Sequence, residues 1–152
     1  MTRIAARFAS LAAQRRKAFV AFVTAGDPSL DRTVEIARAL EGAGVDVLEL
    51  GVPFSDPLAD GPVIQRASER ALAKGTSLAS VLEASRRIRA RSELPLLLFS
   101  YMNPLLRYGL ERLARDAVAA GVDGVLVTDL PPEEAGEWID LARPADLDTV
   151  FL

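Results

Sequence analysis

Apolar and polar positions follow one another in blocks along this chain, and the blocks predict alternating strands and helices. Short, nearly uninterrupted apolar segments predict buried parallel strands over residues 18–25, 45–51, 94–101 and 122–129. The segments between them place apolar residues at helical spacing beside capping residues, which predicts helices over 2–14, 31–43, 62–73, 78–91, 104–120 and 133–142. Residues 149–152 resemble the start of a fifth strand.

Strands that alternate with helices are typical of parallel βα units. A repeat supports this, because AGVDVLELGVP at 43–53 and AGVDGVLVTDLP at 120–131 both join a helix end, a turn, a strand and a proline loop. The repeat favours a (β/α)8 TIM barrel, in which functional residues lie at the C-terminal ends of strands. A doubly wound open sheet is the alternative, although GDPS at 26–29 is not its glycine-rich phosphate turn.

The predicted fold class is therefore α/β, an incomplete TIM barrel. We expect residues 1–152 to form about four and a half βα units, the N-terminal part of a single barrel domain whose chain continues beyond Leu152.

The amino-acid composition limits the partners and the catalytic groups that the chain can use. The net charge is −3 and half of the residues are apolar, which favours neither nucleic acid nor an anionic membrane as a partner. Four arginines between residues 86 and 91 are expected to form a solvated helix face. The chain has no Cys and no His, so acid–base chemistry must come from carboxylates, Tyr or Lys. Arginines interrupt the apolar N-terminus, which argues against a signal peptide and makes a cytoplasmic location the default.

The segment VDVLELGVPFSDPLADG, at 45–61, carries the candidate chemistry. Glu49 lies between two leucines in a buried strand, where an acid is costly unless it is paired or neutralised. Asp60 follows in the loop that leaves this strand. The two acids suggest a catalytic carboxylate pair. The structural alternatives are a simple ion pair for Glu49, and a turn or helix-capping role for Asp60.

The residues LELGVPFSDPLADG at 48–61, FVTAGDPS at 22–29, FSYMNP at 99–104 and GVLVTDLPPEE at 124–134 resemble the tryptophan synthase alpha chain family. The resemblance covers essentially the whole chain. It implies a TIM barrel that cleaves indole-3-glycerol phosphate by a retro-aldol reaction to indole and glyceraldehyde 3-phosphate. It also implies a partner beta chain in an alpha2-beta2 assembly. No cofactor is expected in this chain, and pyridoxal phosphate is expected only in the beta chain.

The resemblance assigns the catalytic roles to Glu49 and Asp60. If Leu48 and Leu50 face the outer helices, Glu49 points into the barrel, where burial would raise the pKa of its carboxyl group. Such a group can both give and take a proton near neutrality. Asp60, on a wetter loop, would stay ionised and hold the indole N–H.

The remaining assignments by resemblance concern substrate and partner. Phe22 would lie against the indole ring, or belong to the core. Tyr101 and Asn103 would line the same pocket, or form a plain strand-to-helix turn. Asp129 would be a site residue or a helix cap. Three loop residues would face the beta chain: Pro53, Asp56 and Pro57.

The family holds the substrate phosphate on loops after later strands, so the isolated chain is expected to have little or no activity. Two other functions remain open. One is another phosphate-sugar barrel enzyme, and the other is a catalytically inactive subunit that docks on and activates a beta chain.

Overall fold

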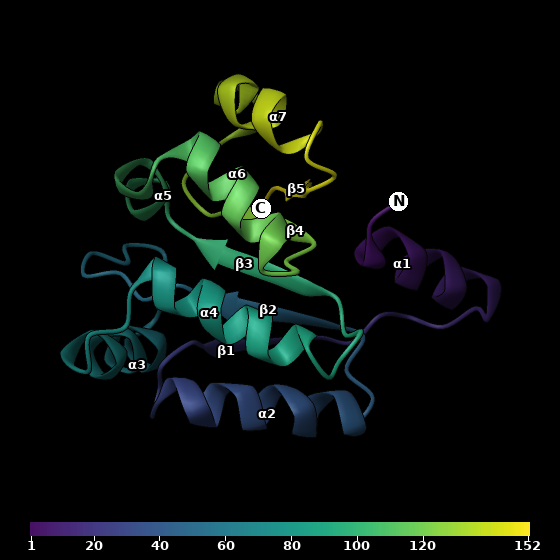
Figure 1. Cartoon of the computed structure of the whole chain (residues 1–152), viewed down its shortest axis with the longest axis horizontal. Coiled ribbons are helices and arrows are strands. Elements are labelled where there is room, and N and C mark those ends of the chain that lie inside the picture. Colours follow the sequence, from purple (N-terminus) through teal and green to yellow (C-terminus); the bar gives the residue numbers. More distant parts are fainter.

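The computed structural model describes residues 1–152, whose strands form one parallel sheet in the order β1-β2-β3-β4-β5 (Figure 1). The strands are β1 (Val20–Thr24), β2 (Val47–Gly51), β3 (Leu96–Ser100), β4 (Gly124–Val127) and β5 (Asp148–Val150). Each strand pairs with the next one along the chain, as in a (β/α) barrel. The order does not reverse, so the sheet is not doubly wound.

The helices lie between and before the strands. They are α1 (Arg3–Ala13), α2 (Leu30–Gly42), α3 (Pro62–Ala73), α4 (Leu78–Arg89), α5 (Met102–Tyr108), α6 (Leu110–Ala119) and α7 (Gly136–Ala142), with a 3-10 turn η1 (Pro132–Glu134) before α7. None of them combines the length and apolarity that a bilayer-spanning helix needs.

Helices cover one face of the sheet and the main core lies beneath them. Figure 1 shows α2, α4 and α6 side by side in front of the strands. Leu48 and Leu50 are fully buried in this core. Val47 and Leu97 belong to a separate small cluster on the opposite face, because successive strand residues point to opposite sides. Glu49 shares the face of Val47, so the predicted orientation of β2 is confirmed.

Two predicted helices differ from the structure. Residues 104–120 form α5 and α6 rather than one helix, because Gly109 between them has a φ of +95°, which an α-helix does not allow. The predicted helix over 133–142 is wrong in its first part, which is the turn η1, so that α7 begins only at Gly136. The fifth strand begins one residue earlier than expected, at Asp148.

The repeated Gly-Val-Asp turn has a structural role at the N-terminal ends of the strands. The Asp46 carboxylate accepts a hydrogen bond from the backbone N–H of Phe19 at 2.9 Å, and Asp123 accepts one from Leu96 at 2.8 Å. Both aspartates are almost fully buried. Each therefore ties the turn before its own strand to the start of the preceding strand, which explains why the motif occurs twice.

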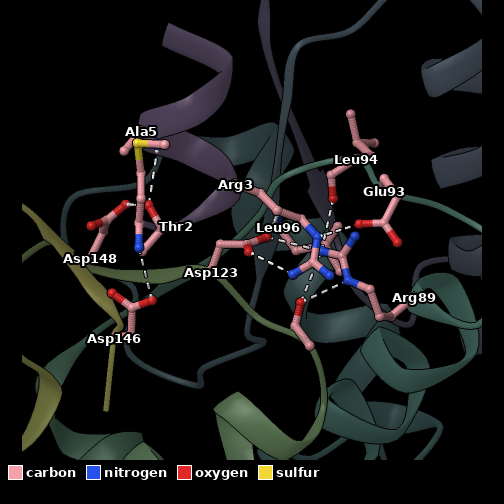
Figure 2. A network of polar contacts seen from close by, with 12 residues as sticks. Thr2, Arg3, Ala5, Arg89, Glu93, Leu94, Leu96, Asp123, Asp146 and Asp148 are labelled. Carbon is pink, nitrogen blue, oxygen red and sulfur yellow. Dashed lines mark hydrogen bonds and ion pairs between the residues drawn. The ribbon is translucent and has the colours of Figure 1, made fainter. Parts of the chain in front are cut away.

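Asp123 is also the centre of an ion-pair network (Figure 2). It lies 2.9 Å from a guanidinium nitrogen of Arg89 and 3.1 Å from one of Arg3, so α1 is tied to the start of β4. Arg89 also donates to the carbonyl oxygens of Gly121 and Leu94. The expectation that the arginines at 86–91 are all solvated is wrong for Arg89, whose side chain is only 13% exposed.

Asp123→Ala should destabilise the chain by about 3–5 kcal/mol, because it leaves the buried Arg89 without its counter-ion and the Leu96 N–H without its acceptor. Asp31→Ala is the control. Asp31 makes an ion pair of similar length with Arg87, 2.8 Å, but is exposed, and its loss should cost less than about 1 kcal/mol. Urea denaturation measures both variants, and equal losses would contradict this role for Asp123.

Candidate active site

Glu49 is an acid without a partner on the face of the sheet opposite the main core. It lies in the middle of β2, beside Phe22 of β1 and Leu97 of β3 in the strand register. The side chain is half-buried and its carboxylate makes no hydrogen bond or ion pair, so the alternative of a structural ion pair is wrong. Burial raises the pKa of the Glu49 carboxyl group above its ordinary value, as predicted.

Aromatic rings form the surface next to Glu49. Phe22 and Phe99 meet edge to face with their ring centres 5.2 Å apart. Gly51 makes room for them, because a Cβ atom there would lie only 2.5 Å from the Phe22 ring. Phe22 thus shares the face of Glu49 on the neighbouring strand, which is the position that a ring-stacking residue needs.

Asp60 ends a turn in the loop between β2 and α3. Its backbone N–H donates to the carbonyl oxygen of Pro57 at 3.1 Å, and its own carbonyl accepts from the side-chain amide of Gln65 at 2.8 Å. Gly61 is the N-cap residue of α3, so the helix-capping alternative for Asp60 is wrong. The half-buried Asp60 carboxylate forms no ion pair, and it lies close to the Tyr101 hydroxyl group.

Tyr101 and Asp129 lie at the C-terminal ends of β3 and β4. Tyr101 is buried, and its hydroxyl oxygen accepts a hydrogen bond from the N–H of Ala59 at 2.9 Å. Asp129 is exposed and accepts from the N–H of Met102 at 2.7 Å, so the predicted capping contact is present. Substrate contact by either residue stays a prediction.

Asn103 lies on the exposed side of α5 and lines a groove together with Phe54 and Tyr108. Neither Glu49 nor Phe22 lines this groove, whose other lining residues come from residues 52–53 after β2, from the segment 72–79 and from α5. A role for Asn103 in substrate binding stays a prediction.

The loop that was assigned to the partner is only partly exposed. Asp56 is exposed and accepts a hydrogen bond from the Ser55 hydroxyl at 2.7 Å, whereas Pro57 is half-buried and Pro53 is buried. Leu58 is 93% exposed, which the sequence reasoning missed although an apolar residue between turn residues was a usable signal.

Thr24 is a second residue that the sequence reasoning missed. It ends β1 on the same face as Phe22, opposite Gly51 of β2. Its hydroxyl group is buried and has no hydrogen-bond partner, which is costly in a folded protein. The signal was a hydroxyl at the C-terminal end of an otherwise apolar strand, where barrel sites form.

Comparison with known proteins identifies this arrangement. A sequence model described as tryptophan synthase alpha chain matches residues 8–152. The chain belongs to the tryptophan synthase alpha chain family. It is 59% identical over 152 residues to the alpha chain of Solibacter usitatus and 58% identical over 153 residues to that of Leptothrix cholodnii. All of this chain is matched, but it spans only 57% and 56% of those relatives.

Solved structures of the family show the same fold. Subunit alpha of Legionella pneumophila superposes with a TM-score of 0.96 at 45% identity, covering 98% of this chain and 57% of that one. An alpha2-beta2 complex from Pyrococcus furiosus gives a TM-score of 0.84 at 40% identity, covering 88% and 57%. The five-stranded sheet is therefore the N-terminal portion of the family's TIM barrel, and the predicted fold class is confirmed.

The raised pKa of Glu49 makes a prediction about stability. A carboxyl group whose pKa is higher in the folded state lowers the stability as pH rises above the unfolded value. Glu49→Gln should therefore unfold at higher urea concentration than the parent at pH 7, and this advantage should disappear well below pH 4.5. Glu69→Gln, an exposed change on α3, should give no such gain at either pH, and a gain as large as that of Glu49→Gln would refute the prediction.

Proposed function

We propose that this chain supplies the acid–base centre of an alpha subunit that cleaves indole-3-glycerol phosphate to indole and glyceraldehyde 3-phosphate. One observation carries the proposal: Glu49 is an unpaired, half-buried acid with a raised pKa, and it lies beside Phe22 on the inner face of the sheet. A half-buried acid that forms no hydrogen bond or ion pair does not stabilise the fold, and this supports a functional role for it.

The proposed chemistry needs two proton transfers. The carbon–carbon bond between the indole ring and the glycerol chain breaks when a proton is added to the ring carbon and another is removed from the adjacent hydroxyl group. A carboxyl group with a raised pKa can perform both steps near neutral pH, which suits Glu49. Asp60 would accept the indole N–H and stabilise the positive charge that develops on the ring. Phe22 would hold the ring by stacking.

The partner in this proposal is a beta chain. Mutual activation is described for the alpha2-beta2 complex of Pyrococcus furiosus, whose fold this chain shares. The most exposed apolar side chain of the 53–60 loop, Leu58, offers a docking contact, with the exposed carboxylate of Asp56 beside it. We also propose that pyridoxal phosphate is bound by the beta chain alone and that both chains act in the cytoplasm.

Glu49→Gln tests the proposal in an alpha chain of the family's full length, assayed for indole release with a beta chain present. Loss of the acid–base group should lower kcat by a factor of about 100 to 10,000. Activation of the beta chain should persist, because Glu49 lies on the inner face of the sheet and not on the exposed surface of the loop. Glu69→Gln should leave both activities unchanged.

The exposure of Leu58 fits equally well a subunit that docks without catalysis, which is the second candidate function. The same assay separates the two functions. If the parent chain activates the beta chain but releases no indole, only docking remains. If Glu49→Gln leaves cleavage intact, Glu49 is not the acid–base group and the proposed mechanism fails.

The isolated 152-residue chain should release indole at a small fraction of the full-length rate, even with Glu49 and Asp60 present. The phosphate group supplies binding energy that orients the substrate, and we place its site in the part of the relatives that this chain does not match. Indole release by the purified 152-residue chain, measured beside a full-length alpha chain, checks this. Equal rates would contradict it.

A further inference from the structure

Tyr101 contacts the 53–60 loop at two separate points. Its hydroxyl oxygen accepts the N–H of Ala59 near the end of the loop, at 2.9 Å. Its ring lies 5.4 Å, centre to centre, from the ring of Phe54 near the start of the loop. Tyr101 itself is 5% exposed and follows directly on β3. A buried side chain next to the end of β3 thus contacts a loop that has no strand-pairing hydrogen bonds of its own.

Two polar groups lie next to each other beside this contact. The Tyr101 hydroxyl accepts from Ala59, and the Asp60 carboxylate lies within reach of its proton. The Asp60 carboxylate, on the next residue, forms no ion pair, while its backbone is bonded to Pro57 and Gln65. Burial and, after it, the nearby charge of Asp60 raise the pKa of the Tyr101 phenol, as expected for two groups in close proximity.

We propose that Tyr101 is a positioning residue, which accepts the N–H of Ala59 and donates its phenolic proton to the Asp60 carboxylate. One oxygen would then fix both the backbone before Asp60 and the direction of its side chain. The proposal rests on the proposed function only in giving Asp60 the task of holding the indole N–H. It also joins the exposed segment around Leu58 to the sheet through a single side chain.

The chain contains a matched control, because Tyr108 is its only other tyrosine and donates its hydroxyl to Asp116 instead. In nuclear magnetic resonance of the 152-residue chain, Tyr101→Phe should speed amide exchange at Ala59 about fivefold or more and shift the carboxyl carbon signal of Asp60. Tyr108→Phe should change neither. If Ala59 alone responds, or neither group responds, Tyr101 does not hold the Asp60 carboxylate and the proposal is overturned.

A second measurement decides the matter if Tyr101→Phe does not fold. In a Tyr108→Phe background the ultraviolet signal of phenolate reports Tyr101 alone. Asp60→Asn should move the midpoint of this titration to lower pH, whereas Asp56→Asn, on the exposed part of the loop, should leave it in place. An equal midpoint in both variants overturns the proposal. Neither measurement uses substrate, so they are independent of the Glu49→Gln assay that tests the proposed function.

Discussion

A strand that packs against helices on one face must present every second residue to the other face. This alternation determines which strand residues of the candidate site share one face of the sheet. In β2 the core takes Leu48 and Leu50, so the residue between them has no access to the helices. The neighbouring strands supply Phe22 and Leu97 at the same level, and neither can neutralise a carboxylate. Glu49 therefore remains partly desolvated and unpaired. The pKa of its carboxyl group rises because the alternation of the strand places it among apolar neighbours.

Carboxylates at the N-terminal ends of the strands have charged and backbone partners, whereas those of the candidate site have no counter-ion. At the N-terminal ends, Asp46 and Asp123 are buried but fully partnered by backbone N–H groups and arginines. In the middle of β2 and in the loop after it, Glu49 and Asp60 form no ion pair, and Glu49 accepts no hydrogen bond. The first arrangement stabilises the fold. The second leaves two carboxylates without counter-ions, and under the proposed function the substrate would supply their contacts. This division agrees with the separation of stability and catalysis between the two faces of barrels.

Sequence patterns predicted the strands and the orientation of β2 because period-two alternation and apolar runs are local signals. They failed where a long-range contact or a single backbone angle decided the outcome. Gly109 looks like any helical glycine until its φ of +95° separates α5 from α6. Arg89 has the spacing of a surface residue, but its partners Gly121 and Asp123 come from the next βα unit. The unpaired hydroxyl of Thr24 is visible only once the strands are packed.

Under the proposed function, the 53–60 loop has to satisfy two demands that conflict. A docking surface benefits from exposed, adaptable side chains such as Leu58, whereas a group that holds an N–H donor must be fixed in direction. The structure separates these demands within a few residues: Leu58 has no packing partner to restrain it, and Ala59 is already bonded to the buried Tyr101. Because Phe54 and Ala59 both contact Tyr101, the exposed Leu58 lies in a segment that is held on both sides. Under the proposed function, a partner that binds at Leu58 would act next to the backbone that carries Asp60.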